Sequence, residues 1–269
     1  MSKLSLKNAV VEYKYLFRPP SLADGIDEDL GRDLCQLACE FAQSAGILLK
    51  LPQVTMATAQ VLIHRYYYRS SLKNTGVQDL AMGALFLASK VEESPRKIKD
   101  IINVFHYLIN KFRGNDTKPM EPYSNDFYVM KKGLLQAEMQ ILTKLAFNVQ
   151  VQLPYGLLIN YIRSLDLTNH PSFPQVAWNY LNDSLRTNVY VCYQPPTIAC
   201  AMIFLAARTC QIKLPLSPPW WEVFDASIED MENISGHILN VYRKKLPSNL
   251  PLTSSELEEY VKNARRHRN

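Results

Sequence analysis

Hydrophobic side chains recur at helical spacing along nearly the whole chain, and this pattern predicts an all-α protein. In the first half, apolar residues between Leu30 and Ala45 lie on one helix face, and the apolar positions of four further helices follow. Proline, serine and glycine mark where these helices begin and end. We expect one helix to end at Gly46 and others to begin at Pro52 and at Ser94-Pro95. A loop is expected over 113–125, followed by a helix over about 127–145.

The second half repeats this organisation, with helices that begin at Pro154, Pro174 and Pro195 and a last core helix over 228–242. A shift of 118 positions places residues 80–90 on residues 198–208. Both segments are apolar nearly all round, which is typical of a helix surrounded by other helices. We favour an internal duplication over two unrelated buried helices of similar composition. The identical pairs fall at Ala81, Phe86, Leu87 and Ala88, and the last pair keeps a cation.

The repeat predicts two tandem five-helix domains, over 26–150 and 151–246. An N-terminal arm over 1–25 precedes them, and a polar, basic tail over 247–269 follows. With 47% hydrophobic and 20% charged residues, the composition is that of a globular protein. The longest apolar run, Ile198 to Ala207, is about half of a membrane span, so we expect a soluble intracellular protein.

Composition and motifs also argue against catalysis and metal binding. The chain has only 9 glycines in 269 residues, and it has no P-loop, GxSxG or HExxH motif. His64-Arg65-Tyr66 lacks the aspartate of a kinase catalytic loop. We therefore expect a protein that is not an enzyme and needs no cofactor. The cysteines form no CxxC pair and no histidine lies at ligand spacing from them, which predicts reduced thiols and no metal site: Cys35, Cys39, Cys192, Cys200 and Cys210.

Two charged residues on the predicted core helices are candidates for partner binding. Lys90 ends the first central helix, where complementing the helix dipole would by itself account for a cation. Glu138 lies in the helix over about 127–145, between Leu135 and Leu142, on an apolar edge beside the core stripe. A helix with a spare apolar edge and one carboxylate in it commonly binds a partner.

These residues carry a family resemblance. The run Leu87-Ala88-Ser89-Lys90-Val91-Glu92-Glu93, followed by Glu138 in a helix ending Leu145-Ala146-Phe147, resembles the first cyclin box. The duplicated organisation is similar to that of cyclins over about 26–245. Within cyclins, the chain most resembles the L-type branch associated with transcription and splicing. The segments that match this branch are 45–49, 51–54, 101–106, 198–201 and, as the most specific, 177–188 around Trp178.

The resemblance implies the activating subunit of a cyclin-dependent kinase, acting in the nucleus in RNA polymerase II transcription and pre-mRNA splicing. The implied partner is a kinase of the subclass numbered eleven, or of the twelve/thirteen subclass. In the family, the lysine and glutamate at the positions of Lys90 and Glu138 bind main-chain groups near the kinase's regulatory helix. The apolar residues of the expected kinase-binding surface are Leu87, Val91, Leu135, Leu142, Phe147 and Val149.

Some family features are absent. The segment Asp33 to Ala38 does not resemble the substrate-docking patch of cell-cycle cyclins, so we do not expect it to recruit RxL substrates. Arg-Ser dipeptides occur only singly, at Arg69 and Arg163, whereas animal L-type cyclins carry a long Arg-Ser tail. Alternatives are a K- or T-type elongation cyclin and a DNA-binding factor of the TFIIB type. A factor of the TFIIB type usually has a zinc ribbon, and this chain has no cysteine pair that could form one.

The net charge of +5 is a mild bias and falls short of the basic footprint of a nucleic-acid-binding protein. A local cluster of basic residues nevertheless follows the first central helix. It is either a solvated helix face or a patch for acidic polymerase tails, phosphorylated segments or RNA. Its members are Arg96, Lys97, Lys99, Lys111, Arg113 and Lys118.

Overall fold

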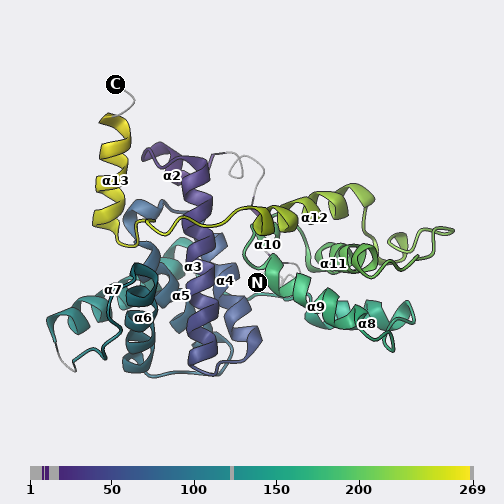
Figure 1. Ribbon diagram of the computed structural model, residues 1–269, viewed down its shortest axis with the longest axis horizontal. Coiled ribbons are helices and arrows are strands. Elements are labelled where there is room, and N and C mark those ends of the chain that lie inside the picture. The colour runs from purple at the N-terminus through teal and green to yellow at the C-terminus, as the bar shows by residue number, and fades with distance from the viewer. Residues whose placement is uncertain (1–7, 9, 12–17, 122–123, 267–269) are drawn as a thin grey trace. The chain divides into compact units, whose positions relative to one another are not determined.

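The computed structural model describes residues 8, 10–11, 18–121 and 124–266, and every regular element among them is a helix (Figure 1). None of the described helices is long and apolar enough to span a lipid bilayer. The α-helices are α2 (Pro20–Ala23), α3 (Glu28–Leu48), α4 (Gln53–Tyr67), α5 (Val77–Val91), α6 (Ile98–Arg113), α7 (Asn125–Lys144), α8 (Tyr155–Ser164), α9 (Phe173–Ser184), α10 (Val189–Cys192), α11 (Pro195–Thr209), α12 (Ile228–Arg243) and α13 (Ser254–Arg266).

The helices form two compact units. The first unit comprises Val11–Gln150 and Leu246–Asn269, and the second comprises Met1–Val10 and Val151–Lys245. Helices α3 to α7 make up the body of the first unit, and α8 to α12 that of the second. Most of the expected N-terminal arm lies outside the described residues. Of its described part, Asn8 is buried in the second unit, where its amide donates to the Gln152 carbonyl oxygen at 2.8 Å.

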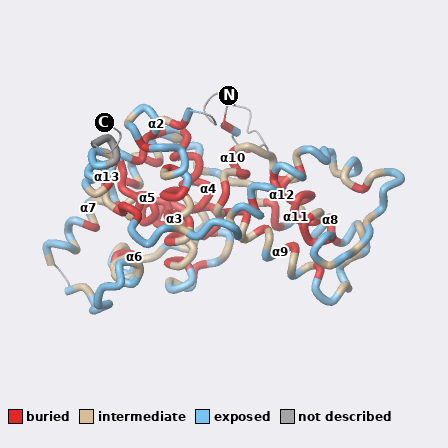
Figure 2. The backbone as a smooth tube through the Cα atoms, turned by 45° about the horizontal axis from the view of Figure 1, so that its top comes forward, coloured by how far each residue is buried: buried red, intermediate tan, exposed pale blue. Residues whose placement is uncertain are grey.

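Each unit is built around one buried helix, α5 in the first and α11 in the second. The bounds of these helices differ by 118 positions at both ends, as the sequence repeat predicts. Figure 2 shows buried residues concentrated in α3, α4 and α5 of the first unit. The repeat extends to a side-chain contact, because Lys90 lies 3.8 Å from the centre of the Phe86 ring and Arg208 lies 4.3 Å from that of Phe204.

The C-terminal segment is part of the first unit. Its leucines 250, 252 and 257 are buried, although the composition of residues 247–269 is polar and basic. The carbonyl oxygen of Leu252 accepts a hydrogen bond at 3.1 Å from the backbone N–H of Gln78, in the first turn of α5. The helix α13 then packs beside the short 3₁₀ turn at Leu72–Asn74. The segment therefore covers the N-terminal end of the central helix.

Gly46 does not stop the first long helix, contrary to the sequence prediction. It lies inside α3, which ends two residues later at Leu48. A Cβ at Gly46 would lie 2.2 Å from Cγ of Met56, in α4. The glycine is therefore required by the close packing of α4 against α3.

The prediction that Ser94 and Pro95 start the next helix is also wrong, because α6 begins at Ile98. The chain turns after α5 through Glu93, which has a φ of 51°, and residues 94–97 then have no regular secondary structure. Arg96 fixes this stretch by donating hydrogen bonds to the carbonyl oxygens of Leu49 (3.1 Å) and Lys50 (3.0 Å) at the end of α3. These tertiary bonds override the local helix-start signal.

The helices α5 and α7 cross at very short range. A Cβ at Gly83 would lie 2.7 Å from the Cβ of Ala137 and 2.8 Å from the backbone nitrogen of Glu138. One of these contacts is with backbone, so a side chain at Gly83 cannot be accommodated by a simple rotamer change. The absence of a side chain at Gly83 therefore allows the short distance between the two helices at this point.

We expect Gly83→Ala to lower the free energy of unfolding by about 1–3 kcal/mol, because it overpacks this crossing. The matched control is Gly236→Ala in the middle of α12, where a Cβ would meet nothing within 4 Å. That change should instead stabilise the chain by about 0.5–1 kcal/mol, since alanine is the better helix former. Urea-induced unfolding measures both, and equal stability of Gly83→Ala and the unmodified chain would contradict the tight crossing.

Candidate functional site

The crossing of α5 and α7 brings together the two charged residues that the sequence singles out. Lys90 Nζ lies 2.7 Å from Glu138 Oε1, and the ion pair joins the last turn of α5 to the outer side of α7. The Lys90 side chain is 46% exposed and that of Glu138 is 12% exposed. Lys90 also lies over the Phe86 ring. The pair is thus positioned by packing and remains open to solvent on the lysine side.

The predicted apolar residues differ in how far they reach solvent. Leu87 is buried, and Val91, Leu142 and Val149 are half-buried. Leu135 is 41% exposed and Phe147 is 67% exposed. An exposed phenylalanine beside half-buried aliphatic residues is typical of a partner surface.

Phe147 owes its exposure to the turn that ends α7. Ala146 and Phe147 both have positive φ, of 48° and 60°. The Phe147 N–H donates to the carbonyl oxygen of Leu142 at 2.8 Å, and the Val149 N–H donates to that of Phe147 at 3.0 Å. Non-glycine residues seldom adopt this backbone conformation, and it is often found at functional sites. The turn therefore fixes the phenyl ring on the outside of the unit.

Polar side chains inside the unit hold α7 and this turn in place. The Tyr66 hydroxyl donates to Gln140 Oε1 at 2.9 Å, and Thr75 binds the same oxygen. Arg65 donates to the carbonyl oxygen of Gln150 at 2.9 Å, just beyond the turn. Sequence reasoning missed these positioning residues, because it considered Arg65 and Tyr66 only as part of a motif that lacks a catalytic aspartate.

The exposed apolar edge of α7 is longer than predicted. Tyr128, Val129 and Met139 are each at least half exposed. A shallow groove on this edge is lined by Tyr128, Lys131, Lys132, Leu135, Gln136 and Met139. The helical spacing of residues 128, 135 and 139 on the side opposite the core stripe was the signal that could have revealed it.

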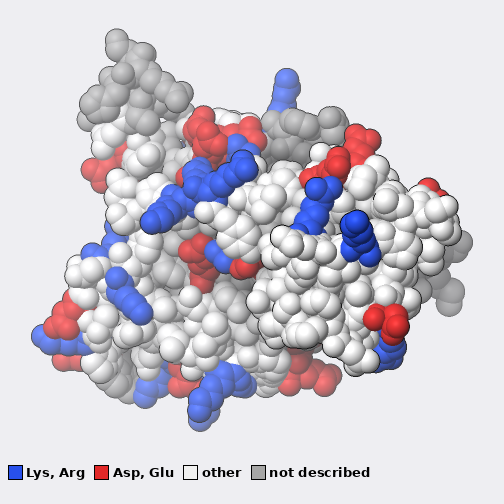
Figure 3. Space-filling model, turned by 45° about the vertical axis from the view of Figure 1, so that its right-hand side comes forward, with Lys and Arg blue, Asp and Glu red and all other residues white. Residues whose placement is uncertain are grey.

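The basic cluster after α5 is not a uniform surface. Arg96 is used by the fold, Arg113 pairs with Glu256, and Lys118 Nζ lies 3.1 Å from Asp116. On the face drawn in Figure 3, positive and negative side chains are interspersed among uncharged ones. These pairings favour the interpretation of a solvated helix face.

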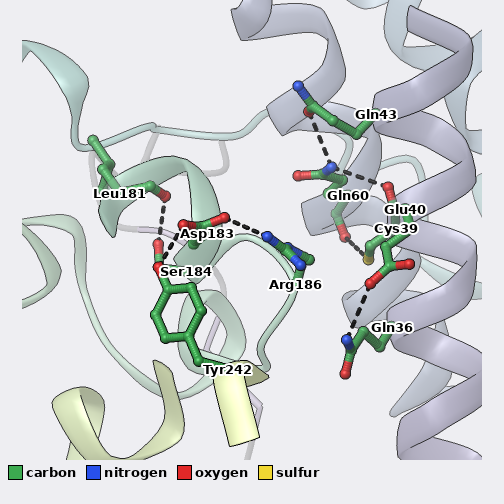
Figure 4. Close-up of polar contacts among 10 residues, drawn as sticks. All are labelled: Gln36, Cys39, Glu40, Gln43, Gln60, Leu181, Asp183, Ser184, Arg186 and Tyr242. Carbon is green, nitrogen blue, oxygen red and sulfur yellow. Dashed lines mark hydrogen bonds and ion pairs between the residues drawn. The ribbon is translucent and has the colours of Figure 1, made fainter. Parts of the chain in front are cut away.

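The sequence segment around Trp178, in the second unit, forms mostly internal contacts. The Trp178 ring lies 4.8 Å from that of Tyr155, whose hydroxyl donates to Asn182 at 2.8 Å. Figure 4 shows the polar cluster in which Asp183 binds both Arg186 and the Tyr242 hydroxyl. Its distinctive residues are therefore explained by packing within the unit.

Comparisons with known proteins show which family the chain resembles. Residues 27–150 match the family model of the cyclin N-terminal domain. The chain is 42% identical over 256 residues to Cyclin-L1 of Homo sapiens, which covers 95% of this chain and 48% of that protein. The chain belongs to the cyclin family. It is also 42% identical over 243 residues to Cyclin-L2 of Homo sapiens, covering 90% of this chain and 46% of the relative. This cyclin thus spans about half the length of the curated relatives it matches.

Solved structures show the same fold. One chain from the crystal structure of the yeast RNA Pol II CTD kinase CTDK-1 complex matches with a TM-score of 0.70 and 20% identity, covering 98% of this cyclin and 86% of that chain. One from the CAK complex of Chaetomium thermophilum matches with a TM-score of 0.57 and 20% identity, covering 95% and 79%. The likeness extends over both units, as the predicted two-domain cyclin fold requires.

We expect Lys90→Ala to change the free energy of unfolding by no more than about 1 kcal/mol, because ion pairs open to solvent contribute little to stability. Leu134→Ala, a buried residue on α7, is the comparison and should cost about 2–5 kcal/mol. Urea-induced unfolding of both variants tests this. A loss at Lys90→Ala as large as that at Leu134→Ala would show that the pair is a structural element of the unit.

Proposed function

We propose that this cyclin binds a cyclin-dependent kinase through the surface around Lys90 and Glu138 and activates it. The observation that carries the proposal is the solvent-open ion pair set beside Leu135, Leu142 and Phe147. Lysine has three donors and the carboxylate has a second oxygen, so both can bind main-chain groups of a partner while they remain paired. The small contribution to stability that is expected of a solvent-open ion pair fits residues that serve a partner.

The relatives support the same proposal. Those at about 42% identity are named Cyclin-L1 and Cyclin-L2, and the structural neighbours come from complexes described as a CTD kinase and as CAK. The chain itself is not an enzyme under this proposal. Its effect is exerted on the catalytic subunit.

The size of the expected effect is physically reasonable. A kinase is active when the glutamate of its regulatory helix pairs with the strand lysine that positions the phosphates. Shifting that equilibrium from 1:99 to 99:1 takes about 5.5 kcal/mol of differential binding. Two charge-assisted hydrogen bonds of about 1.5–3 kcal/mol each, together with burial of an exposed phenylalanine for about 1.5–3 kcal/mol, supply this amount.

The finer assignment rests on the resemblance to L-type cyclins. We propose a nuclear protein that pairs with a kinase of the eleven subclass, or of the twelve/thirteen subclass. Its proposed roles are RNA polymerase II transcription and pre-mRNA splicing. The second candidate is a K- or T-type elongation cyclin, which would use the same surface on a kinase of the nine subclass.

We expect Lys90→Ala combined with Glu138→Ala to reduce kinase capture and activation by about 100-fold or more, as the loss of two charge-assisted bonds predicts. The experiment is a pull-down of the tagged chain from nuclear extract, with bound kinases identified by mass spectrometry and assayed. Arg208→Ala is the matched control, since this cation has the same place on α11 and contacts Phe204 in the same way.

Circular dichroism and urea unfolding establish that the double variant is folded. Undiminished kinase capture and activity in the folded double variant would contradict the proposed site. Recovery of a nine-subclass kinase would support the same binding mechanism and would assign the chain to the elongation cyclins. Recovery of promoter-DNA factors without any kinase would overturn the function.

A further inference from the structure

The contact between α3 and α4 contains polar groups in the middle of an apolar core. On α3, Gly31, Cys35 and Cys39 follow one another at intervals of four residues and so share one face. On α4, His64 and Tyr67 pack against this face. The side chains of all four residues other than glycine are buried. We call this row the α3–α4 polar seam.

His64 lies between the two thiols. Its Nδ1 is 3.3 Å from Sγ of Cys35, and its Nε2 is 3.4 Å from Sγ of Cys39. All three side chains offer soft ligand atoms within 4.8 Å of one another. No other group of three or more cysteine, histidine or acidic side chains with this spacing occurs among the described residues. Sequence spacing could not reveal the cluster, because His64 is 25 residues beyond Cys39 and reaches it only when the helices pack.

The three side chains lie close enough together to serve as ligands of a tetrahedral zinc ion. With Zn–S bonds of about 2.3 Å and Zn–N bonds of about 2.0–2.1 Å, sulfur and nitrogen ligands lie about 3.6 Å apart. The two observed separations involve different nitrogens of the His64 ring, and a zinc ion binds only one of them, so the ring would have to turn to bring one nitrogen to this distance from both sulfurs. The Cys-x₃-Cys spacing places both sulfurs on one side of a single helix, and the histidine comes from its neighbour.

Charge also fits a zinc ion at a fully buried site. Two thiolates, a neutral imidazole and one Zn²⁺ sum to zero, which avoids the large cost of burying a net charge.

One further group of the seam has an unsatisfied oxygen. The Tyr67 hydroxyl is buried and has no hydrogen-bond partner among the described residues. It occupies the space left by Gly31, where a Cβ would lie 2.4 Å from it, one helical turn before Cys35. The polar groups of the seam therefore do not fully satisfy one another.

We propose that Cys35, Cys39 and His64 bind a structural zinc ion that ties α3 to α4 in the first unit. Because the ligands lie in the core and away from the exposed face of α7, the ion would act on stability and would leave the Lys90–Glu138 surface unchanged. A ligand that binds only the folded chain raises its stability in proportion to the logarithm of its concentration over the dissociation constant.

The first test is the metal content of the full chain purified without chelators, measured by plasma mass spectrometry. We expect about one zinc per chain in the unmodified protein and less than about one tenth of that in Cys35→Ser with Cys39→Ser. The control, Cys192→Ser with Cys200→Ser, removes two thiols from the second unit and should leave the zinc content unchanged.

A second test needs no variant, in case loss of the thiols prevents folding. The unmodified chain, stripped by a chelator, is titrated with Co²⁺, and we expect thiolate-to-cobalt absorption in the near ultraviolet that added Zn²⁺ abolishes. If the chain is zinc-free as purified and the folded, stripped chain gives no such absorption, the proposal is overturned. His64 would then only exchange hydrogen bonds with the two thiols.

Discussion

The close crossing of α5 and α7 at Gly83 is the contact on which the proposed kinase-binding surface depends. Without a side chain at that position, the backbone of α7 approaches the central helix until Ala137 and Glu138 are in contact with it. Two turns further along α5, Lys90 therefore meets Glu138 at 2.7 Å. Gly133 continues the same approach, since a Cβ there would lie 2.5 Å from the Asp79 carboxylate. A wider crossing would separate the two charges and move the apolar edge of α7 with them.

The polar groups of the first unit have two different roles. Those that point inward, such as Gln140 and Arg65, hold α7 and the turn after it in one position. Those that point outward, Lys90 above all, are expected to contribute little to stability, and Lys90 is open to solvent and so to a partner. The strained turn at Phe147 belongs with the second group, because its backbone conformation serves to expose a large apolar ring. A regulatory subunit biases the conformation of another protein by binding one of its conformations better than the other. For this it needs a surface that the fold holds rigidly, even where the surface residues themselves add little stability.

The internal repeat clarifies which features are shared by the two units and which are particular to the first. The phenylalanine–cation contact occurs on both central helices, at Lys90 and Arg208, and so is explained by the duplicated helix itself. The ion pair with α7 and the exposed turn belong to the first unit. The distinctive segment around Trp178 packs within the second unit. Its likeness to L-type cyclins is therefore better evidence of common ancestry than of a binding site.

Helical periodicity and the repeat were enough to predict the all-α class and the central helices, because these follow from local spacing. The sequence marked Lys90 and Glu138 separately as candidates for partner binding, and only the crossing of α5 and α7 pairs them. Tertiary structure alone decided the rest. Gly46 continues α3 because Met56 packs there, and α6 starts late because Arg96 binds the end of α3. The same holds for His64, which meets Cys35 and Cys39 only through the packing of α4 on α3. Contacts between residues far apart in the chain leave no periodic signal in the sequence, so their consequences appear only in the folded protein.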